Sequence, residues 1–432
     1  MRIFKRYILP ILLLTSCILA SAEDGVNTGY SPYSKFGIGR LGQRNTAYSQ
    51  TMGGVGVANR NHRYINTLNP AAVAARDTLA FMCDFSIVQN NSYYSQNGRS
   101  SVDNTFNINS FVMSFPIWRS SAFMVGINPF SGLGYNFSDV VEDPDIVGVT
   151  GNVSDYSKGT GSLYELYLGA GATFWKRLSV GAQMNFYFGN LTKTGARSFE
   201  NASLASIYSV SAMSVWGLNG KFGLQYEQPI GKKDRLTVGA TYSLRTQLRG
   251  QGSKVSYTTQ SSVVDTLGKA QPINLDKTSI PDAFTVGLSY ANADRFYVEF
   301  DYSRSDWRNS GMDKVEGFAS KGFTCALSQS FNLGMEFTPN RNDIRYYMRR
   351  VTYRLGAYYS EDYYRFNGNK VSAAAITLGM TLPVFRWSNG LTLGMEVGQR
   401  GNAKNGLVRE NFVNFSIGIN IYDIWFVKPK YE

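Results

Sequence analysis

The sequence predicts an all-β protein, a 14-stranded antiparallel transmembrane β-barrel with a small N-terminal plug. Apolar and polar residues alternate strictly along many segments, which is the pattern of strands with one apolar and one polar face. The connections between these segments alternate between short and long, which is typical of outer-membrane barrels. The composition agrees, because 28 Tyr, 27 Phe and 43 Gly suit strands and turns.

The N-terminus is predicted to be a signal peptide, residues 1–22. Arg2, Lys5 and Arg6 precede an apolar run, and Ala-Ser-Ala at 20–22 fits cleavage before Glu23. LTSC at 14–17 also matches a lipoprotein box that would lipidate Cys17. The apolar residues after Cys17 suit a lipid-anchored terminus poorly, so ordinary cleavage is favoured. The later sequence has no apolar stretch of spanning length, so no transmembrane helix is expected.

Residues 23–77 do not alternate and are predicted to form the plug. They are rich in glycine, and they are too few and too weakly apolar to be stable alone. Placed in the lumen, they would close it. The barrel is then predicted to span residues 78–432, in the outer membrane, with both termini in the periplasm.

Fourteen segments carry the alternation. In the last of them Val413, Phe415, Ile417, Ile419 and Ile421 form one face, with polar residues and glycine between them. The predicted strands are 79–87, 106–115, 123–127, 164–174, 178–188, 210–226, 236–248, 284–290, 296–302, 323–337, 353–359, 376–382, 391–397 and 411–422.

The polar face of these strands indicates a wet lumen. It includes Glu165, Arg245, Arg354 and Glu396, which could not be packed in a dry core without a large free-energy cost. A wide barrel holds such charges in water, so the apolar face must point at lipid. Membrane lipid is therefore an expected partner.

The connections and tryptophans predict the two ends of the barrel. Trp118, Trp175, Trp387 and Trp425 lie at the ends with short turns, as expected of an interfacial aromatic girdle. Short connections are expected near 118–121, 175–177, 229–234, 292–294, 339–349 and 386–389, and long ones near 91–103, 138–161, 192–206, 249–280, 305–320, 361–370 and 399–409.

Several motifs resemble FadL-type outer-membrane transporters, in the branch typical of Bacteroidota. They are GIGRLG at 37–42, MGGVGVA at 52–58, NPAA at 69–72, IPDAFTVGLSY at 280–290, and the C-terminal stretch from GMTLPVFRW through LVRENF to DIWFVKPKYE. The resemblance implies a plugged barrel for passive uptake of fatty-acid-like molecules. It implies that Asn69, Pro70 and Ala71 anchor or gate the plug, although this motif could equally be a structural turn.

The resemblance also implies a channel that opens sideways into the membrane at a kink in the third strand. Pro129, Gly132 and Gly134 in that region make a kink or bulge plausible.

Catalytic and metal chemistry are not expected. His62 is the one histidine, which excludes a multi-histidine metal site, and it is interpreted as a solvated residue of the plug, so a histidine-based triad is not expected. Cys83 and Cys325 fall on the apolar phase of non-neighbouring strands, so both are expected to face lipid without forming a disulfide. The acidic cluster of Asp139, Glu142, Asp143 and Asp145 is interpreted as a solvated loop, with a Ca²⁺ site as the less favoured alternative. No cofactor is expected. No nucleic-acid binding is expected either, because the Lys and Arg behind the net charge of +12 are scattered.

Three functions remain open. The leading hypothesis is uptake of hydrophobic small molecules, which predicts an apolar pocket near the outer mouth. The alternative is an accessory barrel subunit of an outer-membrane protein secretion or assembly complex, acting through other outer-membrane proteins. A general porin would need an open lumen, which the plug disfavours.

Overall fold

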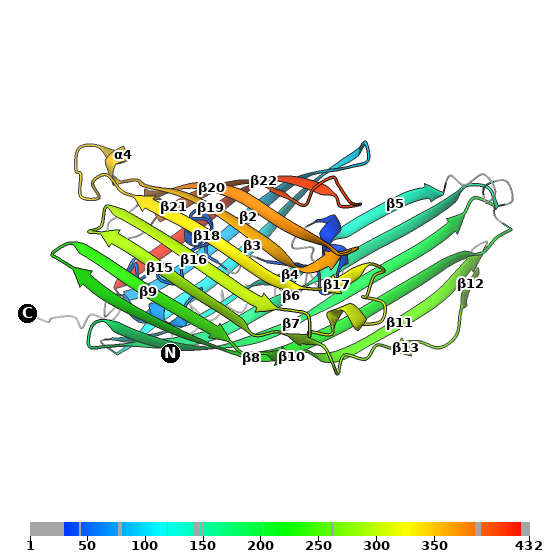
Figure 1. Ribbon diagram of the computed structural model, residues 1–432, viewed down its shortest axis with the longest axis horizontal. Helices are drawn as coiled ribbons and strands as arrows, with labels where there is room; N and C mark the ends of the chain where they lie inside the picture. Colours follow the sequence, from blue (N-terminus) through cyan, green and yellow to red (C-terminus); the bar gives the residue numbers. More distant parts are fainter. Residues whose placement is uncertain are drawn as a thin grey trace, which may run out of the picture.

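The computed structural model describes residues 30–42, 45–76, 80–118, 120–141, 147, 150–201, 203–260, 263–384 and 390–424. These residues form a closed 14-stranded antiparallel barrel (Figure 1). The predicted fold class is therefore confirmed. Among the described residues, no helix has the length and apolarity that crossing a membrane requires.

Each predicted strand has a counterpart in the barrel wall. The first and last strands close the cylinder, in a register that runs from Ala80 opposite Ile424 to Ser95 opposite Arg409. The wall strands are β2 (Ala80–Gln96), β3 (Arg99–Trp118), β4 (Ser121–Gly132), β6 (Val153–Phe174), β7 (Leu178–Phe199), β8 (Ser206–Ile230), β9 (Asp234–Ser243), β15 (Ala283–Asn292), β16 (Phe296–Asp306), β18 (Leu327–Phe337), β19 (Thr352–Phe366), β20 (Asn369–Pro383), β21 (Gly390–Arg400) and β22 (Arg409–Ile424).

The two faces of the wall follow the alternation. On β22 the side chains of Phe415 and Ile417 are exposed on the outside, whereas Asn414 and Asn420 are buried inside. A strand has a side-chain period of two, so every apolar residue of the alternating set reaches the same outer face. That outer face is the one that suits lipid.

Several predicted long loops are instead extensions of the wall. β7 and β8 stay paired as far as Arg197 and Ile207, so most of the segment 192–206 belongs to the two strands. Antiparallel pairing satisfies the backbone of these polar residues where alternation is weak. The shorter strands are β5 (Tyr135–Val141), which continues β4; β11 (Arg249–Gln260), which continues β9; β12 (Val263–Thr266); β13 (Gln271–Pro272); β17 (Phe323–Cys325), which precedes β18; and the pair β10 (Thr246–Gln247) and β14 (Ser279–Ile280).

One predicted short turn is long. The connection between β18 and β19 covers residues 338–351 and holds the one-turn helix α4 (Tyr347–Arg350). It protrudes beyond the strand ends in Figure 1. We call this end of the barrel the short-turn end and the opposite one the long-loop end.

The described N-terminal segment, residues 30–42 and 45–76, lies inside the barrel, where Figure 1 shows it in blue. It contains η1 (Pro32–Lys35), β1 (Arg40–Leu41), α2 (Ala47–Gln50) and η2 (Pro70–Ala74). It has little regular structure of its own, so it depends on the wall for most of its packing.

Glycines of the wall let the segment approach closely. A Cβ on Gly181 would lie 2.3 Å from the carbonyl carbon of Pro70, and one on Gly239 would lie 2.1 Å from the Val57 oxygen. Both contacts are with backbone, which cannot swing aside. We call this inward-facing set the glycine belt; it comprises Gly171, Gly181, Gly223, Gly239, Gly287, Gly334, Gly356, Gly379, Gly394 and Gly418.

An apolar cluster, here called the mouth cluster, fills the lumen toward the long-loop end. The N-terminal segment, the wall and two long loops all contribute to it, and the second loop carries η3 (Met312–Lys314). Its side chains are packed against one another, with Phe130 and Leu191 fully buried. The cluster includes Tyr33, Phe36, Ile38, Phe130, Leu133, Tyr187, Leu191, Ile273, Leu275, Trp307, Met312, Phe318, Phe323, Cys325, Tyr363 and Tyr364.

Candidate functional site in the barrel lumen

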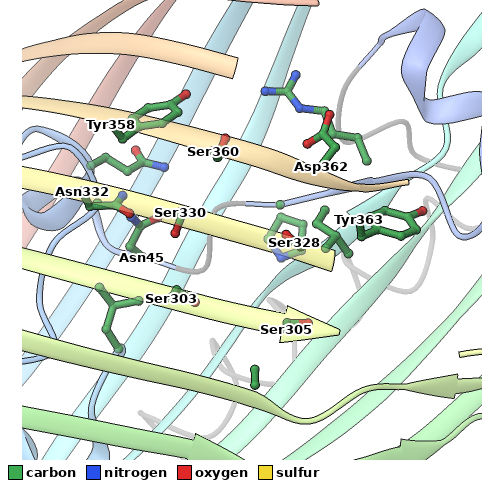
Figure 2. A pocket seen from close by; sticks show the side chains of 18 of the residues that line it. Asn45, Ser303, Ser305, Ser328, Ser330, Asn332, Tyr358, Ser360, Asp362 and Tyr363 are labelled. Carbon is green, nitrogen blue, oxygen red and sulfur yellow. The ribbon is translucent and has the colours of Figure 1, made fainter. Parts of the chain in front are cut away.

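A cavity of about 440 Å³ lies between the N-terminal segment and the wall. Figure 2 shows that its labelled lining is mostly short polar side chains carried by neighbouring strands. Ser303 on β16 is opposite Ser330 on β18, which in turn is opposite Ser360 on β19. Such hydroxyl groups suit water or polar groups better than a hydrocarbon.

The uptake hypothesis expects an apolar pocket near the outer mouth, and this cavity is not such a pocket. The apolar side chains of that region are packed together in the mouth cluster. Trp307 and Tyr363, for example, have ring centroids 4.5 Å apart. A hydrophobic ligand could enter there only if these side chains separated.

The barrel wall is interrupted beside β4. Pairing of β3 with β4 runs from Trp118 opposite Ser121 only as far as Phe111 opposite Ile127. Beyond that point, β4 and then β5 are paired with β6, while the outer part of β3 is paired with β2. We call this interruption the β3–β4 break.

The residues predicted to kink the third strand lie at the β3–β4 break. The register of β4 on β6 shifts between Pro129 and Ser131, and proline has no N–H to donate to a ladder. Gly132 ends β4, and Gly134 lies in the gap before β5. The cavity reaches this point, because Pro129 and Gly132 line it together with Asn107–Asn109 of β3.

The N-terminal segment spans the β3–β4 break. On one side, β1 pairs with the free edge of β4, with Arg40 opposite Gly132. On the other side, the Asn109 side chain of β3 donates to the Asn45 carbonyl and accepts from Gln50, at 2.9 Å each. The segment thus ties together two wall strands that do not pair there.

Asn69, Pro70 and Ala71 meet at the wall as one unit. The Asn69 Oδ1 accepts from the Ala71 N–H at 3.0 Å, which caps η2, and Pro70 occupies the first helical position. The Asn69 Nδ2 donates to the carbonyls of Val57 at 2.8 Å and Leu224 at 3.2 Å. Asn69 and Ala71 are fully buried, so this motif fixes η2 on β8.

Two acids of β16 hold the glycine-rich part of the segment. The Asp301 carboxylate accepts from the N–H groups of Gly56 at 2.8 Å and Val57 at 3.0 Å. The Glu299 carboxylate accepts from the Ala58 N–H at 2.6 Å. The alternation placed both acids in the lumen, but nothing local in the sequence identified their partners.

Arg354 is the centre of a second contact. Its Nε lies 3.0 Å from Glu336 Oε2, and its guanidinium lies over the rings of Tyr48 and Tyr64 at 4.3 and 5.1 Å. It also donates to Thr381 at 2.7 Å. This predicted lumen residue therefore supports the N-terminal segment.

The other predicted lumen residues lie apart from one another. Glu165 is buried and accepts from Asn128 and Tyr187. Glu396 lines the cavity and accepts from Tyr358.

Arg245 lies elsewhere, in the interval between β9 and β10. It is exposed, and its guanidinium donates to Ser279 and to the Asn309 carbonyl. It therefore ties two long loops together.

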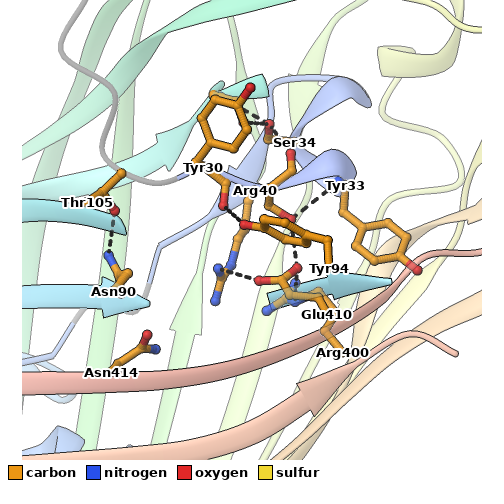
Figure 3. Close-up of polar contacts among 12 residues, drawn as sticks. Tyr30, Tyr33, Ser34, Arg40, Asn90, Tyr94, Thr105, Arg400, Glu410 and Asn414 are labelled. Atoms are coloured by element: carbon orange, nitrogen blue, oxygen red, sulfur yellow. Dashed lines mark hydrogen bonds and ion pairs between the residues drawn. The ribbon is translucent and has the colours of Figure 1, made fainter. Parts of the chain in front are cut away.

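An ionic cluster near the mouth was missed by the sequence reasoning (Figure 3). The fully buried Glu410 accepts from Ser31 at 2.8 Å and lies 3.5 Å from Arg40 and 3.9 Å from Arg400. Arg400 is also 2.8 Å from Asp362. These residues are far apart in sequence, so only the closed barrel brings them together.

Two of the predicted girdle tryptophans, Trp118 and Trp175, are exposed at the short-turn end. The other two, Trp387 and Trp425, lie outside the described residues, as do Cys17 and 142–145. The prediction for Cys325 was wrong, because it is buried in the mouth cluster, where Ser310 donates to its sulfur. The register against β19 shifts by one residue between Cys325 opposite Tyr364 and Gln329 opposite Glu361, so Cys325 has the opposite phase to β18.

Solved structures share this fold. The P. putida toluene transporter TodX is 14% identical over 89% of this chain and 99% of its own, with a TM-score of 0.62. The Ralstonia pickettii toluene transporter TbuX is 18% identical over 87% and 97%, with a TM-score of 0.58. A Pseudomonas aeruginosa FadL homologue is 10% identical over 93% and 99%, with a TM-score of 0.52. At these identities, the likeness concerns the fold.

No curated protein matches the chain. A family model described as BamG matches residues 3–432, which is nearly the whole sequence. The chain therefore belongs to the BamG family, built on a FadL-like barrel.

Proposed function

We propose that the protein is an outer-membrane channel for the passive uptake of hydrophobic, fatty-acid-like molecules. The observation that supports this most directly is the β3–β4 break, because the lumen cavity reaches it. A molecule that crossed the lumen would leave sideways into the membrane through the break. The solved relatives of this fold include toluene transporters, which agrees with such a route.

The proposed orientation has the short-turn end in the periplasm together with both termini. Residues 1–22 would be removed as a signal peptide, 23–77 would act as the plug, and 78–432 would form the barrel. Asn69, Pro70 and Ala71 would hold the plug in place. Movement of residues 40–50 away from the β3–β4 break would then open the route.

A reversible cross-link tests this route. Leu41→Cys with Ser131→Cys, which are directly opposite on the paired strands β1 and β4, in a background with Cys83 and Cys325 changed to Ser, would lock the segment onto β4 at the break. Uptake of a fluorescent fatty acid by cells should fall several-fold when the disulfide forms and recover with reductant. Unchanged uptake on oxidation would contradict the proposal.

A matched control places the same cross-link away from the β3–β4 break. Thr173→Cys with Ser179→Cys replaces two hydroxyls 2.8 Å apart at the short-turn end of the β6–β7 hairpin. Oxidation of this pair should leave uptake unchanged.

A second candidate function is that of an accessory barrel subunit in an outer-membrane protein assembly complex. Membership of the BamG family favours it. So do the packed mouth cluster and the polar cavity, which suit a hydrophobic cargo poorly. Purification from native membranes distinguishes the two, because a subunit would co-purify with barrel partners in fixed ratio, whereas a lone channel would elute as a monomer.

A further inference from the structure

A basic groove of about 770 Å³ lies at the short-turn end. Three hairpin connections line it, at 229–235, 293–295 and 339–342, together with Arg63 of the N-terminal segment. Because Arg63 belongs to the segment inside the barrel, the groove lies at the lumen opening and not on the lipid-facing wall. Its cations are Arg63, Lys232, Lys233, Arg235, Arg295 and Arg341, and its anions are Asp234 and Asp294.

The two acids of the groove are already engaged. Asp294 lies 3.1 Å from Arg63 and 4.0 Å from Arg235. Burial acts to raise the pKa of Asp294, but the attraction of Arg63 and Arg341 outweighs it and holds that pKa below its usual value. Asp234 accepts from Tyr290 at 2.9 Å and from Asn292 at 2.6 Å.

Three cations of the groove are left for an external partner. No ion pair joins Lys232, Lys233 or Arg295 to another residue in the described part of the chain, and all three are exposed. Six cations against two anions give the groove a positive field, which attracts an acidic ligand and speeds its association.

The loop 338–351 presents an apolar surface beside the groove, and its first residues line the groove itself. Ile344 is 100% exposed and Met348 60%. When a partner covers a fully exposed aliphatic side chain, the complex is stabilised by roughly 25 cal/mol per Å² of apolar surface buried. Exposed apolar side chains rimmed by charges are typical of protein interfaces.

Contacts within the loop restrain its conformation. Asp343 accepts from the N–H groups of Arg345 and Tyr346 at 2.8 Å each, and its carboxylate lies 3.3 Å from Arg349. The Arg349 guanidinium also lies over the Tyr346 ring at 4.7 Å. A preorganised loop loses little entropy when it binds, which favours a docking role.

We propose that the basic groove and the loop 338–351 together dock an acidic segment of a second protein. Carboxylates of that segment would lie against Lys232, Lys233 and Arg295, and an apolar side chain would cover Ile344. This proposal goes beyond uptake and does not require it. That the partner is periplasmic rests on the orientation proposed above.

A defined peptide tests the groove. The full-length protein in phosphatidylcholine nanodiscs is titrated into a fluorescein-labelled peptide of alternating glutamate and leucine, or into its lysine and leucine counterpart, and anisotropy is followed. The acidic peptide should bind, the basic one should not, and affinity should fall as salt is raised. Equal binding of the two peptides overturns the proposal.

Charge-reversed variants locate the binding. K232E/K233E should weaken the acidic peptide by roughly tenfold or more, since two attractive contacts become repulsive. K269E/K404E makes the same charge change in exposed loops at the long-loop end and should have no effect. Equal loss in both variants would mean a general field effect and would sink the docking site.

Two further arms distinguish protein from lipid. If adding phosphatidylglycerol to the nanodiscs abolishes peptide binding, lipid headgroups occupy the groove and the proposal fails. In cells, a photo-cross-linking residue at Ile344 should capture an acid-rich protein segment, and K232E/K233E should abolish the product. The same probe at Trp175, 84% exposed at the same end, is the control; equal capture there, or capture of lipid alone, contradicts the proposal.

Discussion

Asn69 uses both ends of its amide group at the contact between the N-terminal segment and the wall. Its oxygen caps η2, and its nitrogen donates to one carbonyl of the segment and one of β8. A single buried side chain thus satisfies three backbone groups that water cannot reach. Few other residues of this size could replace it, since both a donor and an acceptor are needed.

Asn69→Ala should therefore loosen η2 from the wall. Loss of an N-cap costs about 0.5–2 kcal/mol, and the lost hydrogen bonds to the Val57 and Leu224 carbonyls add to this. Hydrogen exchange at residues 69–74 should become faster, while exchange in the paired closing strands β2 and β22 stays slow. Asn342→Ala, at an exposed position, is the control; identical exchange in both variants would contradict this role for Asn69.

Single Gly→Ala changes in the glycine belt should displace the N-terminal segment. Gly181→Ala should push η2 away from β7, because its new Cβ would lie 2.3 Å from the carbonyl carbon of Pro70. Limited proteolysis should then cleave within residues 45–76. Gly195→Ala on the same strand has nothing within 4 Å of its Cβ and should leave the protease pattern unchanged.

The neighbouring strands β18 and β19 both contribute to one contact with the N-terminal segment. Glu336 on β18 is directly opposite Arg354 on β19, and the Arg354 guanidinium stacks on two tyrosines of the segment. Both side chains are buried, so each charge offsets the cost of burying the other.

Arg354→Ala should cost about 3–5 kcal/mol, because it leaves the Glu336 carboxylate buried and unpaired. The double variant E336L/R354M removes both charges and should recover most of that loss. Urea unfolding followed by heat-modifiable gel mobility measures both. A double variant as unstable as the single one would show that packing, and not charge, explains the effect.

The sequence predicts strands well because alternation is a local property. All 14 wall strands were found this way, and Pro129, Gly132 and Gly134 were singled out because their backbone limits are intrinsic. The contacts of Glu410 with Ser31 and Arg40 join chain ends about 370 residues apart, so no local pattern indicated them. The polar strand extensions were mistaken for loops because both faces of those strands are wet.

The whole barrel should conduct ions poorly. The N-terminal segment lies in the lumen, and the mouth cluster packs over it toward the long-loop end. In planar bilayers we expect low single-channel conductance for the full chain and a clear increase after deletion of residues 30–76. Gly181→Ala, which keeps every residue of the segment, should raise conductance in part if the segment is the barrier. High conductance of the intact protein would revive the general porin hypothesis.

The closure of the barrel around its own N-terminus sets an order of events during insertion into the membrane. β2 and β22 are the first and last wall strands, and their pairing seals the cylinder. The segment is hydrogen-bonded to β8, β16 and β20 from within, and the mouth cluster packs over it toward the long-loop end. We therefore expect the segment to lie against the curling sheet before β2 and β22 pair, so that the part of the chain synthesised first shapes the interior that the strand synthesised last encloses.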